Sequence, residues 1–402
     1  MLASERLTLQ KRNYRTRILS SLADAGQPAW DALVRAQSEA NPFLWYAFLH
    51  ALHVSGSASQ DSGWQPQYLT LWQDEHIAAA LPMYAKFHSY GEYVFDWAWA
   101  NAYGEHGLAY YPKGLVAVPF TPVPGARLLA IDTSARQALL EAVLQTCQQL
   151  ELSSLHLLFT SPADRQACDA LGLMQRQTVQ FHWHNANPQG SSFDSFDTFL
   201  ASLSQEKRKK IKQERRRVGD AGVTFRVSEG AAICTEDWDF FYQCYERTYL
   251  EHGNAPYLSR AFFQSMQNQM PHNWVLFLAE RDGRPIASSL IALQGLGTPD
   301  AVAYGRYWGA LERVDCLHFE ACYYQPLNWC IAQGVQRFEG GAQGEHKMAR
   351  ALMPVTTYSA HWLAHPAFAD AVERFLERER AGVDHYLDHL VARSPFKRHE
   401  PQ

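Results

Sequence analysis

The segment of this chain best suited to chemistry is the run at positions 339–347, which reads EGGAQGEHK. Its glycines would let backbone amides approach a ligand closely. Glu345 and His346 are candidate general bases that could take a proton from an attacking amine. Lys347 could hold a carboxylate or a phosphate. The simpler alternative is a tight turn whose charged side chains only contact water.

A second polar run, GRYWG at positions 305–309, ends the predicted strand from Ala301 to Trp308. The strand from Val335 to Glu339 follows a long helix and should be its parallel neighbour. Because ligands of open α/β sheets bind beyond the carboxyl ends of strands, we expect one site between the two runs. The predicted binding residues are Arg306, Tyr307, Trp308, His318, Glu339, Gly340, Gly341, Gln343 and Lys347, together with Asp96 from the first half of the chain.

The long helix is predicted to begin at His318 and to end at Gln333, just before Gly334. Amides at a helix N-terminus favour anions, such as a phosphate or a developing oxyanion. Glu320 in the first turn is a third catalytic candidate. A carboxylate at this position is equally well explained as a charge that is favourable to the helix dipole.

Cysteine and metal chemistry find little support in the sequence. The seven cysteines are scattered and form no CxxC pair, which is typical of reduced thiols in a cytosolic protein. His182 and His184 would share one face of a strand, but no third ligand lies at a telling spacing. We therefore predict no metal site.

Two stretches of the chain echo each other at a constant offset of 179 positions (353 − 174 = 179). Leu173-Met174, Thr178 and His182-Trp183 recur as Leu352-Met353, Thr357 and His361-Trp362. An ungapped self-match of this length indicates a duplicated α/β unit, and the alternative is a chance alignment. A second correspondence, between strand–turn–strand patterns at 69–78 and 276–287, supports duplication.

Each copy is predicted to contain helices, a hairpin, a strand, a helix, a strand, a helix and a last strand. In the first copy these are helices at 29–40 and after Asn41-Pro42, a hairpin at 68–84, a strand at Tyr93–Trp99, a helix at 134–150, a strand at 155–159, a helix at 163–171 and a strand at 179–184. In the second they are helices at 239–249 and 260–269, a hairpin at 275–293, a strand at 301–308, the long helix at 318–333, a strand at 335–339 and a strand at 355–362. A charged C-terminal helix follows.

The predicted fold class is therefore α/β, with two tandem domains that have mixed central sheets and are joined by a basic helix. We place an N-terminal extension at 1–24, the first domain at 25–190, the linker helix at 191–218, the second domain at 219–390 and a tail at 391–402. The cations of the linker, Lys207 to Arg217, could meet the phosphates of tRNA or of a nucleotide-linked precursor. Glutamates interleaved with these cations are equally consistent with a solvent-exposed helix face held by ion pairs.

Composition narrows the class of protein further. The formal net charge of −5 argues against a protein whose whole surface binds nucleic acid. No run approaches the roughly 20 apolar residues of a membrane helix, and the N-terminus lacks the apolar segment of a signal peptide. We expect a cytoplasmic protein. Aromatic residues make up 13% of the chain, which suits both a core and a substrate groove.

Several motifs resemble those of the bacterial FemAB-like predicted N-acyltransferases. They are Asn41-Pro42-Phe43, Gly305-Arg306-Tyr307-Trp308-Gly309, Leu317–Gln325 and Glu339–Lys347, and the resemblance extends over roughly residues 25–385. It implies two GNAT-like (acyl-CoA N-acyltransferase) domains, related to Fem-type peptidoglycan aminoacyltransferases. It also implies acyl-CoA or aminoacyl-tRNA as co-substrate, with no tightly bound cofactor. The chain has no long helical arm, and Leu311 stands where acetyl-CoA enzymes have glycine or alanine.

We hypothesise that an amine, on a small molecule or a peptide, attacks an activated acyl carbonyl held in the second half. A base near Glu345 or His346 would remove the proton, and strand amides would hold the acyl oxygen. The first half and the basic helix would help to bind the acceptor, which could be a cell-wall precursor. The alternatives are a binding module for peptidoglycan fragments without chemistry, and a metal hydrolase.

Overall fold

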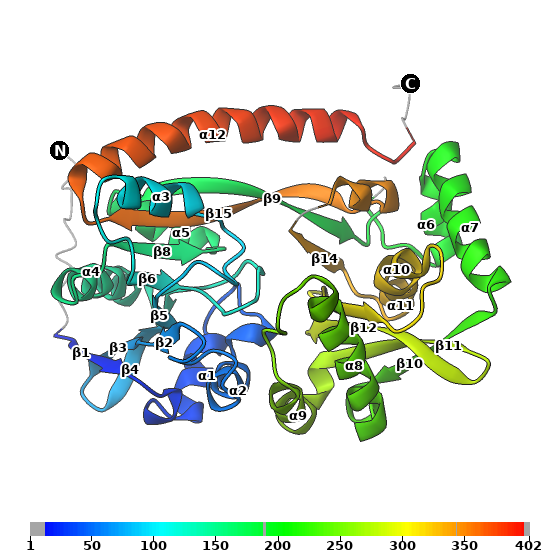
Figure 1. Cartoon of the computed structure of the whole chain (residues 1–402), viewed down its shortest axis with the longest axis horizontal. Coiled ribbons are helices and arrows are strands. Elements are labelled where there is room, and N and C mark those ends of the chain that lie inside the picture. The colour runs from blue at the N-terminus through cyan, green and yellow to red at the C-terminus, as the bar shows by residue number, and fades with distance from the viewer. Residues whose placement is uncertain (1–12, 188–189, 343, 398–402) are drawn as a thin grey trace, which may run out of the picture.

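The computed structural model describes residues 13–187, 190–342 and 344–397. These residues form one sheet with the strand order β10-β11-β12-β13-β14-β9-β15-β8-β6-β5-β2 and a smaller sheet with the order β1-β3-β4-β7. The large sheet runs through both halves of the molecule (Figure 1). The chain is therefore an α/β protein built on a mixed sheet, as the sequence predicted.

The strands are β1 Arg15–Leu19, β2 Trp64–Pro66, β3 Tyr68–Gln73, β4 His76–Leu81, β5 Met83–Lys86, β6 Lys113–Val116, β7 Leu129–Ala130, β8 Ser154–Leu158, β9 Met174–His184, β10 Val223–Glu229, β11 Trp274–Arg281, β12 Arg284–Gln294, β13 Val302–Ala310, β14 Arg337–Ala342 and β15 Met353–Leu363. The helices are α1 Gln27–Arg35, α2 Tyr46–Val54, α3 Trp97–Glu105, α4 Thr133–Gln149, α5 Pro162–Ala170, α6 Phe196–Ser202, α7 Gln205–Asp220, α8 Thr235–Glu251, α9 Arg260–Gln269, α10 Leu317–Phe319, α11 Gln325–Ala332 and α12 Pro366–Ala392. Short 3₁₀ turns are η1 Leu22–Asp24, η2 Pro42–Leu44, η3 Gly230–Ala232, η4 Pro271–Asn273 and η6 Glu345–Arg350, and Glu320–Tyr324 (η5) is a π-helical turn.

The two halves exchange their last strands. β9 of the first half pairs with β14 of the second, and β15 of the second half pairs with β8 of the first. β9 and β15 then pair with each other in antiparallel register, with Thr178 opposite Thr357. Their hydroxyl oxygens lie 2.7 Å apart. Met174 faces His361 and His182 faces Met353, so the repeated positions are related by a local twofold axis that passes near the Thr178–Thr357 pair.

The strand–turn–strand echo is confirmed as two hairpins. β3 pairs with β4, and β11 pairs with β12, each in antiparallel register. The turns place Asp74 and Asp282 at φ 52° and 53°, in the left-handed region that aspartate tolerates better than most residues. Each half also contains one parallel pair, β6 with β8 and β13 with β14. The shared hairpin and parallel pair confirm two tandem α/β units.

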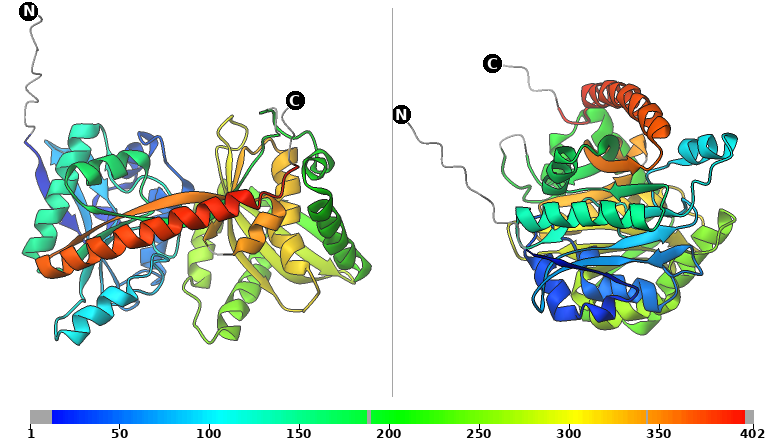
Figure 2. Two further views of the ribbon diagram at one scale, coloured as in Figure 1. Left: turned by 90° about the horizontal axis from the view of Figure 1, so that it is seen from above. Right: turned by 90° about the vertical axis from the view of Figure 1, so that its left-hand side faces the viewer.

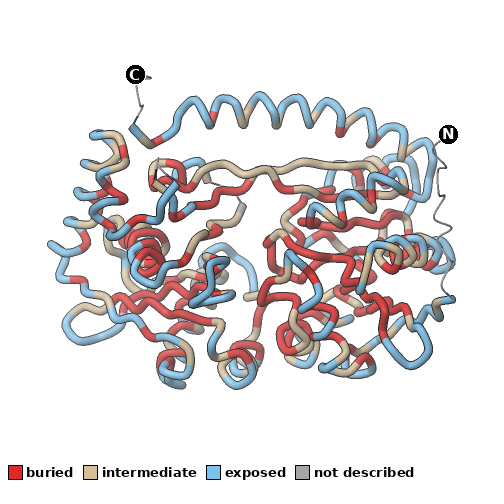
Figure 3. The backbone as a smooth tube through the Cα atoms, turned by 180° about the vertical axis from the view of Figure 1, so that it is seen from behind, coloured by how far each residue is buried: buried red, intermediate tan, exposed pale blue. Residues whose placement is uncertain are grey.

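The helix α12 spans both halves. It packs on β9 and β15 (Figures 1 and 2), and Glu379 accepts two hydrogen bonds from Arg176 of β9. Figure 3 shows that most residues of α12 are exposed, while Val372, Leu376 and Leu390 are buried. A further tie between the halves lies in the core, where Phe48 of α2 packs edge-on against Phe262 of α9 at 5.3 Å.

Three predicted elements are wrong in extent or type. Tyr93–Trp99 is not a strand: it is a loop that leads into α3, and its pattern is inverted, with Asp96 buried and Phe95 and Trp97 exposed. The linker is two helices, since Leu203 is extended and Ser204 starts α7 as its cap. The helix predicted at 29–40 ends at Arg35.

Candidate functional site

The candidate site lies where β13 and β14 separate. The strands pair in parallel only through Val302–Tyr304 and Arg337–Glu339, so the backbone from Gly305 onward has no partner on that side. A cavity of about 140 Å³ opens there. This inner cavity is lined by Ser289, Gly305, Arg306, Tyr307, Trp308, His318, Cys322, Tyr323, Phe338, Gly340 and Lys347. Six of the predicted binding residues, from both strand ends and the helix start, are thus brought together.

Glycine is required on both strands where they diverge. A Cβ on Gly305 would lie 2.9 Å from the ring of Phe338, and one on Gly340 would lie 2.3 Å from Cδ2 of Leu352. Real Cβ atoms do not approach other atoms this closely, so larger residues would push the strands apart. Gly305 and Gly340 therefore serve close packing beside the cavity.

Arg306 connects the inner cavity to the first half. The register between β12 and β13 pairs Leu290 with Tyr307 and Ile291 with Gly305, so Arg306 occupies a β-bulge. Its Nη2 donates to the carbonyl of Phe120 at 2.9 Å, across the boundary between the halves. Bulges commonly re-aim a side chain beside a functional site, and here the bulge directs a cation at the other half.

A second, larger cavity lies between the halves on the far side of this contact. This interface cavity has a volume of about 470 Å³. Its lining residues are, from the first half, Ser55, Gly56, Ser57, Ser62, Trp64, His88, Tyr90 and Phe120, and, from the second, Asn254, Ala255, Pro256, Tyr257 and Ser259. Phe120 stacks on Tyr257 at 4.7 Å, so the Arg306–Phe120 contact forms part of the wall between the interface cavity and the inner cavity.

The helical side of the inner cavity carries neutral proton acceptors and donors. Burial lowers the pKa of His318 to about 4, which leaves its imidazole uncharged at neutral pH. The Tyr323 hydroxyl lies 3.3 Å from Nε2 of His346. Partial burial, together with Arg350 and Lys347, lowers the pKa of His346 as well. Both histidines can therefore accept a proton.

Lys347 closes one side of the inner cavity. Its Nζ donates to the carbonyl of Gly340 at 2.6 Å and to that of Gly341 at 3.4 Å. Burial lowers the pKa of this ammonium to about 8. Gly341 itself does not line the cavity, and Gln343 lies outside the described residues.

Glu339 is buried but does not line the inner cavity. Its Oε1 accepts from Arg337 at 3.0 Å, while its Oε2 lies 3.9 Å from Nε2 of His182 and has no hydrogen-bond partner among the described residues. Burial raises the pKa of this carboxyl to about 7. His182 thus lies beside Glu339. The residues that the structure describes contain no group of three or more His, Cys, Asp or Glu side chains that could hold a metal ion.

Glu320 points away from the inner cavity toward the basic helix. Its carboxylate accepts from Nε of Arg215 at 3.1 Å and from Nε2 of Gln325 at 2.7 Å. Burial raises the pKa of Glu320 despite these partners. It lies in the π-helical turn, a feature that often occurs near functional sites, and joins that turn to α7.

Glu345 lies in a separate recess, which we call the outer pocket. Its volume is about 500 Å³, and its lining residues are Lys207, Lys210, Glu345, His346, Met348, Ala349, Ala392, Arg393 and Ser394. The Glu345 carboxylate is held by the hydroxyl of Tyr386 at 3.0 Å and by Nη1 of Arg393 at 3.2 Å, both from the C-terminal region. His346 lines the outer pocket and also contacts Tyr323 of the inner cavity.

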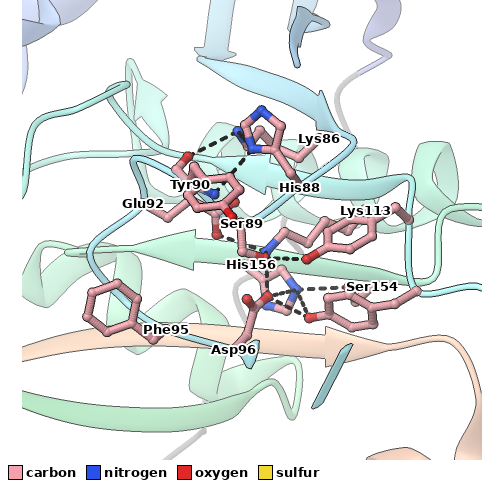
Figure 4. Close-up of polar contacts among 12 residues, drawn as sticks. Lys86, His88, Ser89, Tyr90, Glu92, Phe95, Asp96, Lys113, Ser154 and His156 are labelled. Carbon is pink, nitrogen blue, oxygen red and sulfur yellow. Dashed lines mark hydrogen bonds and ion pairs between the residues drawn. The ribbon is translucent and has the colours of Figure 1, made fainter. Parts of the chain in front are cut away.

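Asp96 belongs to a buried charge cluster in the first half (Figure 4). It accepts from Lys113 and, at 2.6 Å, from the hydroxyl of Tyr110. Burial opposes its ionisation, but Lys113 and then His156 hold its pKa well below the usual range. Lys113 also donates to Glu92 at 2.8 Å. The sequence did not single out Lys113 or Tyr323, because an isolated lysine or tyrosine carries no spacing signal.

The chain belongs to the FemAB-like family, because the family model described as peptidoglycan biosynthesis/recognition matches residues 21–398. No curated protein sequence matches it significantly. A structure of FemX superposes with a TM-score of 0.52 at 11% identity, covering 89% of this chain and 100% of FemX. The C-terminal domain of a putative lysylphosphatidylglycerol synthetase from Agrobacterium fabrum gives 0.51 at 12% identity, covering 87% and 95%.

A tandem GNAT protein from the clavulanic acid biosynthesis pathway is also similar, with a TM-score of 0.46 at 10% identity over 88% of this chain and 99% of that one. At these identities the structural likeness concerns the fold. Among the helices described, none combines the length and apolar character needed to cross a membrane.

Proposed function

We propose that this protein is an N-acyltransferase or aminoacyltransferase whose reaction takes place in the inner cavity. The observation that carries this proposal is the separation of β13 from β14 after three paired residues, with a cavity between the strand ends. This arrangement exposes unpaired backbone of β13 beside neutral histidine and tyrosine side chains. The family's description in terms of peptidoglycan supports an acceptor amine on a cell-wall precursor.

The reaction begins when the lone pair of the acceptor nitrogen attacks the acyl carbonyl, forming the C–N bond. The carbonyl electrons move onto oxygen, where amides of the β13 segment after Gly305 can stabilise the charge. The intermediate then expels the donor's sulfur or ribose oxygen as an anion, which takes a proton from water to become the free thiol or hydroxyl. The ammonium proton passes to His318, or through the Tyr323 hydroxyl to His346 and on to the outer pocket.

The positions of the cavities suggest where each substrate lies. The inner cavity is large enough for the reacting acyl group but not for a whole donor. The interface cavity adjoins it across the Arg306–Phe120 contact and is lined by aromatic and hydroxyl side chains from both halves. We place the acceptor in the interface cavity, so that its amine reaches the acyl carbon past Arg306.

A transfer assay on the purified protein tests the proposal. Acyl-CoA thioesters and aminoacyl-tRNAs are supplied as donors with amino sugars and muropeptides as acceptors, and products are read by mass spectrometry. For an active pair, His318→Asn and Tyr323→Phe should each lower kcat by about 100-fold, the usual contribution of a positioned acid or base. His385→Asn, an exposed histidine on α12, is the matched control and should change nothing.

Equal turnover in His318→Asn, Tyr323→Phe and the wild-type protein would place the reaction elsewhere. Saturable binding of muropeptides with no product from any donor would instead support a binding module on the same fold.

A further inference from the structure

The outer pocket is built from three segments that are distant in sequence. Helix α7 contributes Lys207 and Lys210, η6 contributes Glu345 to Ala349, and the end of α12 contributes Arg393, followed by Ser394. Its charged lining is thus three permanent cations and one carboxylate, with His346 at the edge nearest the inner cavity. Such a recess concentrates positive potential and attracts anions.

The cations of the outer pocket are only partly neutralised. Lys207 pairs with the exposed Glu206 at 3.0 Å, and Arg393 pairs with Glu345 at 3.2 Å. Lys210 forms no hydrogen bond or ion pair with any residue that the structure describes. Exposed pairs of this kind are worth at most about 1 kcal/mol, so a bound anion can compete for both Lys207 and Arg393.

The frame of the outer pocket is held by backbone contacts. Ser204, at the start of α7, donates its N–H to the carbonyl of Pro395 at 2.9 Å, and Lys397 donates to the carbonyl of Ser202 at 3.1 Å. Leu203 and Phe396 form an isolated antiparallel bridge between them. These contacts fix the backbone at the end of α12 against the start of α7, so the two segments that carry Lys210 and Arg393 are held side by side before any ligand binds.

The Glu345 carboxylate occupies the place at Arg393 that the anion of a ligand would take. It lies between Arg393 and Tyr386 on the exposed side of η6, where a ligand anion could replace it. A phosphate offers more charge than a carboxylate and three or more acceptor oxygens, enough for two lysines, an arginine and the Ser394 hydroxyl. The pocket volume of about 500 Å³ suits a nucleotide-sized molecule.

We propose that the outer pocket binds the phosphate or diphosphate group of a nucleotide-sized ligand, with Lys207, Lys210 and Arg393 as its cationic partners. The ligand displaces Glu345 from Arg393. Where it assigns a donor subsite, this inference rests on the proposed function. His346 links the outer pocket to the inner cavity through its contacts with Tyr323 and His318. Binding itself does not depend on the transfer reaction.

Calorimetric titration at low salt tests the inference with four probes: pyrophosphate, uridine diphosphate, coenzyme A and a short RNA oligonucleotide. We expect saturable binding of pyrophosphate and of at least one nucleotide. Lys210→Glu should weaken that binding at least tenfold. Lys209→Glu makes the same charge change one position away on α7 but outside the pocket, and should weaken it less than threefold. Glu345→Gln should tighten it, because the competing carboxylate is gone.

Three results would overturn the inference. One is the absence of saturable binding by pyrophosphate and both nucleotides. Another is an equal loss in Lys209→Glu and Lys210→Glu, with RNA as the tightest probe, which would indicate a diffuse cationic helix. The third is unchanged affinity in Glu345→Gln. His318→Asn should bind all probes normally, so a failure of the transfer chemistry and a failure of this pocket give different results.

Discussion

Replacing Lys113 by methionine would leave two carboxylates buried without their cation. The Lys113 side chain is fully buried, and its Nζ donates to Oε2 of Glu92 at 2.8 Å, to Oγ of Ser89 at 2.8 Å and to Asp96. Burial by itself disfavours the ammonium, yet Glu92 and Asp96 raise the pKa of Lys113 above its ordinary value. The three charges therefore depend on one another (Figure 4).

Removing one partner of a buried ion pair typically costs about 3–5 kcal/mol, because the remaining charge has no compensation. We expect about 4 kcal/mol for Lys113→Met at pH 8, which is a large share of the stability of a typical domain. The pKa of Asp96 is held down in the folded protein, so its contribution is present above the unfolded value and is lost as pH falls. The difference between the proteins should therefore shrink below about pH 4.

Urea unfolding followed by circular dichroism measures the effect, with the wild-type protein and Lys113→Met compared from about pH 2 to pH 8, a range that spans the loss of the Asp96 contribution. The triple variant that adds Glu92→Gln and Asp96→Asn removes the orphaned charges and should recover more than half of the loss. A loss below about 1 kcal/mol at pH 8, the range of exposed pairs, would refute the reasoning. So would a triple variant no more stable than Lys113→Met.

Two further predictions concern stability. Lys86 is buried with its Nζ 3.7 Å from the Trp64 ring centroid, and burial lowers its pKa to about 7. Since the folded protein favours neutral lysine, the wild type should gain up to roughly 5 kcal/mol relative to Lys86→Met as pH rises from 7 to 10.5, and parallel pH curves in urea would contradict this. A Cβ on Gly309 would lie 1.9 Å from the carbonyl oxygen of Cys244, so Gly309→Ala should destabilise by about 3 kcal/mol. Gly219→Ala, in open space on α7, should instead stabilise by about 0.5–1 kcal/mol, and a similar melting temperature for both alanine variants would show that the close contact at Gly309 is relieved at no cost.

The fold brings only part of the predicted set of site residues together in one cavity. The two strand ends meet because parallel neighbours end at one edge of a sheet, and this follows from the order of elements. The side chains of 345–347 separate because η6 is a 3₁₀ helix with three residues per turn, so consecutive residues point in different directions. Glu345 lies in the outer pocket against α12, His346 lies between the outer pocket and Tyr323, and Lys347 lines the inner cavity. Sequence spacing cannot reveal this, because the turn type depends on the left-handed conformation of Gly344.

The loop before α3 is a second place where the prediction from sequence was wrong. The alternation at Tyr93–Trp99 predicted a strand, but a period of two reports only that alternate side chains differ in polarity. Here the polar residue is inside, because Lys113, about 17 positions later in the chain, supplies a buried cation for Asp96. No local pattern could have placed that cation.

The sequence alone determined the duplication, the order of elements from α8 to β15 and the convergence of two glycine-bearing strand ends. The elements depend on residues close together in the chain, and the duplication shows when its two halves are compared. Only the tertiary structure decided the exchange of β9 and β15 between the halves, the bridge from Arg306 to Phe120 and the outer pocket formed by α7, η6 and α12. Either partner strand would present similar apolar faces to β9 or β15, so the choice depends on packing among residues more than a hundred positions apart.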